Sequence, residues 1–320
     1  MPYREETTSL FFNARASESS GAQSFEPELE PAHEVVWPEA PTVPLVISSP
    51  HSGNIYPARF LASARLDART LRRSEDAHVD LLFAPAAALG APLLKALFPR
   101  AYLDLNREPF ELDPKMFEGR LPAYANTRSM RVAGGLGTIA RVVGEAQEIY
   151  AHRLPIEEAL GRIESFYRPY HAALRGLLES SLERFGQVLL IDCHSMPSSS
   201  IANEARQSDG RTIDLVLGDR YGTSAGLGIV DLMDRRLREL GYIVRRNKPY
   251  AGGFITEFYG NPSSNCHAVQ IEVNRRIYMN EKTLERLPAF DQLAADLATA
   301  IGDVTEMLGA AGHQPRLAAE

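Results

Sequence analysis

Residues 44–53, PLVISSPHSG, are an apolar run that stops abruptly in small residues around His51. Continuous apolar runs of this length are typical of strands buried on both faces, as in a parallel sheet. Because longer helical patterns separate this run from others like it, we expect an α/β domain with a mostly parallel sheet covered on both faces. The other runs are QVLLID at 187–192, IDLVLG at 213–218, YIVRR at 242–246 and HAVQIEV at 267–273.

Three longer segments have apolar residues at helical spacing. The first, residues 155–186, contains Pro169, which predicts a kink because proline cannot donate the backbone hydrogen bond of a helix interior. Gly186 is the expected stop of this helix. The other two helices are expected over residues 224–241 and 284–308.

The composition changes near residue 42. Residues 1–41 are rich in Glu, Ser, Ala and Pro, a composition that buries too little apolar surface to offset the entropy of ordering. We therefore expect a mobile N-terminal arm at 1–41, a single α/β domain at 42–310 and a C-terminal tail at 311–320.

The charge balance limits the class of partner. The chain of 320 residues has a formal net charge of -7 and a pI near 5.7. This balance argues against binding nucleic acid or an anionic membrane, because both need a basic face. An anionic substrate would have to meet a local cluster of arginines.

Cysteine usage and the N-terminus bear on the compartment. Cys193 and Cys266 are the only cysteines and no CxxC occurs, so neither a disulfide framework nor a thiolate zinc site is indicated. The N-terminus lacks the apolar segment of a signal peptide, and no apolar run approaches the roughly 18 residues that span a bilayer. We expect a soluble protein of the cytoplasm.

Several polar residues lie on predicted strands or at their ends. In open α/β sheets the loops after the strands gather functional groups at one edge. His51 and His194 end two strands, Glu272 lies within a third, and Glu75 or Asp76 precedes an apolar helix. Two histidines and a carboxylate leave one position of a tetrahedral zinc open for water, and a separate glutamate can transfer its proton.

Each of these residues also has a plain structural interpretation. A single histidine at a strand end is commonly a hydrogen-bonding loop residue. Asp76 could cap the helix that follows it. Glu272 could pair with Arg275 or Arg276. Spacing alone leaves these interpretations open beside the zinc site.

Arginines that could bind an anion lie in two motifs. YLDLNRE at 102–108 is expected to end a short strand in Asn106 and Arg107, and Arg128 and Arg131 precede a glycine-rich stretch. An arginine fork binds a carboxylate through two hydrogen bonds. For Arg131 we favour a solvated surface position.

Six motifs in order resemble the N-formylglutamate amidohydrolase family, over residues 43 to about 283. The resemblance implies a three-layer α/β/α fold with a mixed, mostly parallel sheet of phosphorylase/hydrolase type, as in zinc carboxypeptidase-like proteins. The motifs are SPHSG (49–53), EDAHVD (75–80), LDLNRE (103–108), DCHSMPS (192–198), GGFITEFYGNP (252–262) and HAVQIEVNRRIYMNE (267–281).

The resemblance also implies a site. One zinc ion would be bound by His51, Asp76 and His194, with Glu272 as general base and acid. Asp76 is chosen because the family pattern of Asp, any residue, His, Val, Asp fits residues 76–80. Glu75 stays as the alternative ligand, since related amidases use glutamate at this helix start.

The family substrate is N-formyl-L-glutamate, which is hydrolysed to formate and glutamate in histidine catabolism. Its two carboxylates are groups that the arginines of these motifs would bind. The expected substrate contacts are Asn106, Arg107 and Arg128, and the residues expected to support the ligands from behind are Ser49, Ser52, His78 and Asp80.

The sequence departs from the family pattern in two places. The segment after DCHSMPS is differently composed, so Arg206 or Arg211 would replace an arginine found there in better-known members. Glu257 stands where a basic or neutral residue is common. The exact N-acyl amino acid, a zinc peptidase or peptidoglycan-type amidase activity, and a non-catalytic protein that binds acidic amino acids therefore stay open, as does the oligomeric state.

Overall fold

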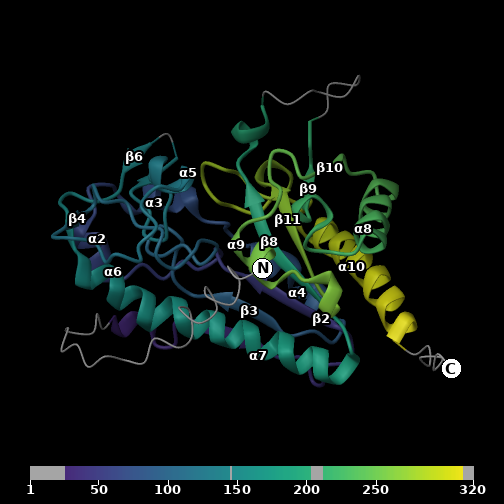
Figure 1. The fold of residues 1–320 in the computed structure, drawn as a ribbon. Coiled ribbons are helices and arrows are strands. Elements are labelled where there is room, and N and C mark those ends of the chain that lie inside the picture. Colours follow the sequence, from purple (N-terminus) through teal and green to yellow (C-terminus); the bar gives the residue numbers. More distant parts are fainter. Residues whose placement is uncertain (1–25, 145, 203–211, 313–320) are drawn as a thin grey trace.

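A seven-stranded mixed sheet forms the centre of the molecule (Figure 1), in the order β1-β3-β2-β8-β11-β9-β10. The computed structural model describes residues 26–144, 146–202 and 212–312. Four neighbouring strands are parallel: β3 (Leu93–Ala96), β2 (Leu45–Ser49), β8 (Val188–Met196) and β11 (Cys266–Asn274). Three strands at the edges run in the opposite direction: β1 (His33–Val36), β9 (Leu215–Gly218) and β10 (Val244–Arg246).

Helices cover both faces of this sheet, and alternate strand residues enter the two cores. Leu45 and Ile47 pack in the core under α4 (Val79–Ala87), α8 (Leu227–Glu239) and α10 (Phe290–Gly312). Val46, between them, packs on the opposite face in the core under α7 (Arg168–Phe185). This is the alternation that a period of two residues requires, and it confirms the expected α/β fold with a mostly parallel sheet.

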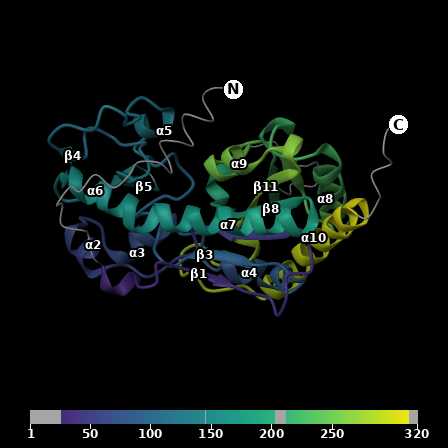
Figure 2. The same ribbon diagram turned by 60° about the horizontal axis from the view of Figure 1, so that its bottom comes forward.

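The long connection between β3 and α7 lies on the α7 face and extends beyond the sheet (Figure 2). It contains the loop that carries Asn106. Its short elements are β4 (Phe117–Glu118), α5 (Met130–Ala133), β5 (Val142–Val143), β6 (Gln147–Glu148), β7 (Leu154–Pro155) and α6 (Ile156–Arg162). The remaining short helices are η1 (Pro27–Leu29), α2 (Ala58–Ser63), α3 (Ala68–Leu71), η2 (Arg72–Ser74), η4 (Ser198–Ile201), η5 (Arg220–Gly222), α9 (Phe254–Tyr259), η6 (Pro262–Ser264) and η7 (Arg275–Ile277).

Two predicted helices differ from the observed ones. The helix expected over 155–186 stays helical from α6 through a π-helical turn, η3 (Ile163–Tyr167), into α7. Pro169, which cannot donate a backbone hydrogen bond, lies in the turn directly after the π-helical one. Gly186 (φ 72°) ends α7 as predicted. α10 begins at Phe290 and not at residue 284, because Leu284 has a positive φ of 61°.

Three other predictions are corrected. Part of the expected mobile arm is structured, since β1 pairs with β3 at residues 33–36; residues 1–25 and 313–320 lie outside the described chain. Residues 102–108 form turns and not the end of a strand. β8 extends to Met196, so His194 lies within a strand, because the strand pairs with β11 along its whole length. Among the described residues, no helix is long and apolar enough to cross a bilayer.

Candidate functional site

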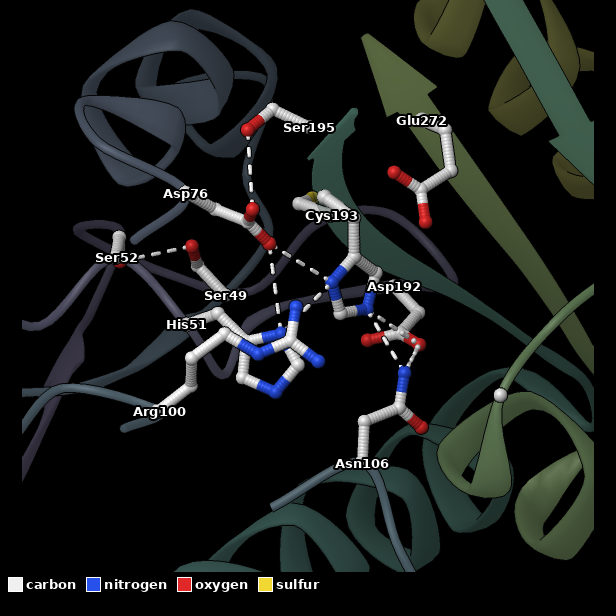
Figure 3. Close-up of polar contacts among 12 residues, drawn as sticks. Ser49, His51, Ser52, Asp76, Arg100, Asn106, Asp192, Cys193, Ser195 and Glu272 are labelled. Atoms are coloured by element: carbon white, nitrogen blue, oxygen red, sulfur yellow. Dashed lines mark hydrogen bonds and ion pairs between the residues drawn. The ribbon is translucent and has the colours of Figure 1, made fainter. Parts of the chain in front are cut away.

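The sheet brings three predicted residues together, His51, His194 and Glu272; Figure 3 labels His51 and Glu272 among them. His51 lies two residues past β2, and β8, which carries His194, is the neighbouring strand. Glu272 on β11 is directly opposite His194 in the parallel register. The backbone N–H of Asp76 donates to the carbonyl of His51 at 3.0 Å, which fixes the start of α4 beside the strand end.

Three side-chain atoms of this cluster form a nearly regular triangle. His51 Nδ1 and His194 Nδ1 are 3.1 Å apart, and Asp76 Oδ2 lies 3.1 Å from His194 Nδ1 and 3.4 Å from His51 Nδ1. All three residues are buried. Two imidazole nitrogens and a carboxylate oxygen that converge in this way form a group that could hold a metal ion.

The outer nitrogen of His51 is bound by a carboxylate. His51 Nε2 lies 2.8 Å from Asp104 Oδ1, and Arg100 donates to the other oxygen of Asp104 at 2.7 Å. Burial raises the pKa of Asp104, but the charges of Arg100 and Arg107 outweigh it and hold that pKa well below its usual range. Asp104 therefore stays ionised, fixes the ring and leaves Nδ1 facing the cluster.

His194 has a similar partner on its own strand. Its Nε2 lies 3.0 Å from Asp192 Oδ2, which also accepts a hydrogen bond from Asn106 Nδ2 at 3.2 Å. Burial lowers the pKa of His194, but Asp192 and Asp76 raise it more, so that pKa lies well above its ordinary value. The raised pKa shows that this site attracts positive charge.

The second oxygen of Asp76 is held by two donors. Ser195 Oγ and Arg275 Nη2 each donate to Asp76 Oδ1 at 3.0 Å. Burial raises the pKa of Asp76, but hydrogen bonds from His194 and His51 and the charge of Arg275 bring it well below its usual range. Asp76 is therefore not the cap of α4, and Arg275 pairs with it and not with Glu272.

Glu272 lies beside the cluster and is buried. Burial, and then the charge of Asp76, raise its pKa to about 7 although His194 lowers it. Its Oε1 accepts a hydrogen bond from Gln270 Nε2 at 2.9 Å. A carboxyl group with a pKa near neutrality can both take and give a proton.

A cavity of about 420 Å³ opens onto these residues. Besides the histidines and Glu272, four arginines reach it. Arginine side chains can bind an anionic group through paired hydrogen bonds. Its lining residues are His51, Arg100, Asn106, Arg107, Arg131, His194, Arg220, Pro249, Tyr250, Ala251, Gly252, Gly253, Gln270 and Glu272.

Several predicted supporting residues lie elsewhere. Glu75 bonds to Tyr56 and Arg72 and contributes no atom to the triangle. His78 lies 2.8 Å from the carbonyl of Leu284 through Nε2, and Asp80 pairs with Lys95. His78 therefore contributes to packing against Leu284, and Asp80 forms an ion pair away from the triangle. Ser49 donates to Ser52 at 2.9 Å (Figure 3), a bond within the turn itself.

The predicted substrate contacts are only partly in the cavity. Asn106 and Arg107 line it, whereas Arg128 is exposed and is not among the lining residues. Arg131 on α5 is exposed, as expected, and also lines the cavity. Glu257 is exposed and pairs with Arg220; residues 206 and 211 lie outside the described chain.

Sequence reasoning missed the residues that bond to the triangle from behind. Asp104 is two residues before Asn106, and Asp192 is two residues before His194. A spacing of two along a strand puts side chains on one face, so Asp192 could have been found from its strand. Asp104 lies in a loop, and no periodicity marks its position.

Comparison with known proteins identifies the family. The family described as N-formylglutamate amidohydrolase matches residues 43–279. The chain is 31% identical to an N-formylglutamate deformylase of Pseudomonas putida over 75% of its length and 83% of the relative's, and 30% identical to one of Pseudomonas aeruginosa over 75% and 84%.

Solved structures are similar as well. A crystal structure of an N-formylglutamate amidohydrolase from Ralstonia eutropha JMP134 matches with a TM-score of 0.81 and 40% identity, over 88% of this chain and 99% of that one. An Agrobacterium tumefaciens gene product shares the fold alone, with a TM-score of 0.61 and 15% identity over 87% and 96%. The chain belongs to the N-formylglutamate amidohydrolase family.

Proposed function

We propose that this protein is a zinc-dependent amidohydrolase that converts N-formyl-L-glutamate and water into formate and L-glutamate. The observation that carries the proposal is the buried triangle of His51, Asp76 and His194 with Glu272 beside it. Relatives that match most of the chain are named for this substrate.

The donor atoms fit a small divalent ion. Ligands about 2.0–2.1 Å from a tetrahedral zinc are roughly 3.3 Å from one another, and the three edges here are 3.1, 3.1 and 3.4 Å. Each donor is also fixed from behind, by Asp104, by Asp192 and by Ser195 with Arg275. A bound zinc ion would act as a Lewis acid towards an amide carbonyl.

The protein's own residues supply the proton transfers and the binding. Glu272 in its carboxylate form can accept a proton from the attacking water and give it to the leaving nitrogen. Its buried position beside His194 favours an enzyme over a protein that only binds, because binding needs no such base. The arginines of the cavity offset the two carboxylates of the substrate.

The setting of the reaction is part of the proposal. We propose a small-molecule N-acyl amino acid as the partner, and neither nucleic acid nor membrane, which the net charge of -7 supports. The cytoplasm and histidine catabolism are the context that the family implies.

The test is metal content together with formate release. Purified protein is measured by elemental analysis, dialysed against a chelator, and assayed with N-formyl-L-glutamate before and after zinc is returned. We expect about one zinc per chain, loss of formate release on chelation and its recovery with zinc. Metal without formate release would redirect the substrate to other N-acyl amino acids, and a metal-free active protein would contradict the zinc proposal.

A further inference from the structure

The turn after β9 carries an arginine on unfavourable backbone. Arg220 and Tyr221 have φ values of 53° and 57°, in the left-handed region that residues with a Cβ rarely adopt. Such strain persists only where the surroundings enforce it, and it gathers at functional sites. The strained turn therefore indicates that the position of Arg220 matters for function.

The surroundings enforce this turn through several hydrogen bonds. Asn247 Oδ1 accepts from the backbone N–H of Asp219 at 3.1 Å and from that of Tyr221 at 3.3 Å. The backbone N–H of Arg220 donates to the carbonyl of Ala251 at 2.8 Å. The backbone on both sides of Arg220 is thus fixed to the segment that follows β10.

The same segment directs the side chain of Arg220 along the cavity wall. Its Nη1 donates to the carbonyl of Gly252 at 3.3 Å, and its Nη2 lies 2.7 Å from Glu257 Oε2. A Cβ at Gly252 would come within 3.2 Å of Arg220 Cδ, so glycine there leaves room for the arginine. Within the described part of the chain, the Nε–H and the remaining Nη–H groups have no acceptor and can donate to a carboxylate.

Strand register directs the backbone that leads to Arg220 away from Glu272. β9 is antiparallel to β11, with Gly218 opposite Gln270. Glu272 is two residues further along β11 in one direction, about 6.6 Å at 3.3 Å per residue. The chain beyond Gly218 continues in the other direction. A group bound by Arg220 would therefore lie at the far end of a substrate whose amide is beside Glu272.

Of the three other arginines of the cavity, Arg131 is exposed on α5 and the other two are already engaged. Arg100 donates to Asp104, and Arg107 donates to the carbonyls of Leu136 and Asn106 and lies 3.4 Å from Asp104. Arg100 and Arg107 thereby hold Asp104, which in turn fixes the ring of His51. Arg220 has no such role in the cluster.

We infer that Arg220 binds the side-chain carboxylate of the N-acyl amino acid and selects acidic over neutral substrates. This inference rests on the function proposed above. Glu257 is a positioning residue, since its carboxylate, on the short helix α9, holds the guanidinium in place.

The test compares two substrates that differ only at the side-chain end. Formate release from N-formyl-L-glutamate and N-formyl-L-glutamine is measured for wild type, Arg220→Gln and Arg220→Lys. Arg236→Gln is the matched control, because Arg236 pairs with Glu239 and Asp303 on the opposite side of the sheet. Metal content equal to that of wild type establishes that each variant is folded.

For Arg220→Gln we expect kcat/KM to fall about 10- to 100-fold with N-formyl-L-glutamate, the size of a lost charged hydrogen bond, and less than about threefold with N-formyl-L-glutamine. Arg220→Lys should be intermediate because it keeps the charge and loses the fork. Equal losses on both substrates, or no loss on either, would overturn the inference.

Glu257→Gln should raise KM for N-formyl-L-glutamate by up to about fivefold, the range of a partly exposed ion pair. We expect an unchanged kcat and recovery in Glu257→Asp. A fall in kcat on both substrates would show a structural role and overturn the positioning assignment.

Binding of glutarate, followed by calorimetry, separates this inference from the proposed function. If wild type binds glutarate and Arg220→Gln does not, the assignment of Arg220 stands even when wild type releases no formate, and only the proposed reaction fails. Equal glutarate binding by both proteins would overturn the assignment whatever the activity.

Discussion

Two buried histidines on the α7 face of the sheet have opposite chemistry. His194 on β8 is bonded to Asp192 and Asp76, and its pKa lies well above the ordinary value because these charges outweigh burial. His171 on α7 lies 2.9 Å from the hydroxyl of Tyr259 and 3.0 Å from the carbonyl of Leu105, and burial lowers its pKa to about 3.

The difference shows that burial alone does not make a histidine functional. Both rings are almost fully buried, but His171 contacts neutral oxygens and aromatic rings, such as the stacked ring of Tyr259. After burial, the charge of Arg175 also lowers its pKa. The ring of His194 instead contacts the carboxylates of Asp192 and Asp76, which favour a positive charge at this position.

The largest expected effect is that of removing His194. We expect His194→Ala to lose the metal and at least about 10⁴-fold in kcat/KM, because a metal ion contributes several kcal/mol to the transition state at tenfold per 1.36 kcal/mol. His171→Gln is the matched control and should keep both the metal and most of the activity. Elemental analysis and formate release measure the pair, and similar metal loss in both variants would remove the distinction.

Glu272→Gln should keep the metal and lose about 10²- to 10⁴-fold in kcat, the usual contribution of a general base. Since the carboxylate is the active form, wild-type activity should fall as the pH drops below the pKa of Glu272. That pKa is about 7 without a cation, and a bound cation lowers it, so the fall lies at or below pH 7. If the activity of Glu272→Gln still falls at acidic pH in the same way, another group causes that fall.

His51, His194 and Glu272 could be proposed from the strand pattern, whereas Asp76 was separated from Glu75 only by the family resemblance. His51 ends an apolar run, and Glu272 faces His194 because neighbouring parallel strands fix their register. Asp104 was not predictable in this way. It is 53 residues from His51 in sequence, and the loop that contains it is placed by tertiary packing rather than by a repeating pattern.

The same limit explains the errors in the fold. β1 has only four residues, half of them exposed, so its sequence resembles that of an unstructured arm. It forms a strand because it pairs with β3, a long-range contact that local sequence does not reveal. Arg131 and Arg128 are three residues apart, but only Arg131 lines the cavity. Local sequence does not decide which of two neighbouring exposed arginines faces a site.

Smaller effects are expected from the carboxylates behind the two ligands. Asp104→Asn and Asp192→Asn keep the shape but remove the charge that fixes each ring. We expect each to lower zinc affinity about 10- to 100-fold, measured by competition with a chromogenic chelator. Asp113→Asn, which removes the partner of Arg141 away from the cavity, is the control, and an equal loss there would point to general destabilisation.

The smallest effect concerns His171 and the stability of the fold. The folded protein keeps His171 neutral down to about pH 3, whereas the unfolded chain binds a proton near its ordinary pKa of about 6.5. The unfolded state therefore binds more protons as the pH falls, and the free energy of unfolding should drop by about 1 kcal/mol between pH 6.5 and 5.5 from this residue alone. Urea unfolding of wild type and His171→Gln at both pH values isolates this contribution, because all other groups titrate in both proteins. If the two proteins lose the same free energy of unfolding over this interval, His171 is not held neutral, and the contrast with His194 would have to rest on geometry alone.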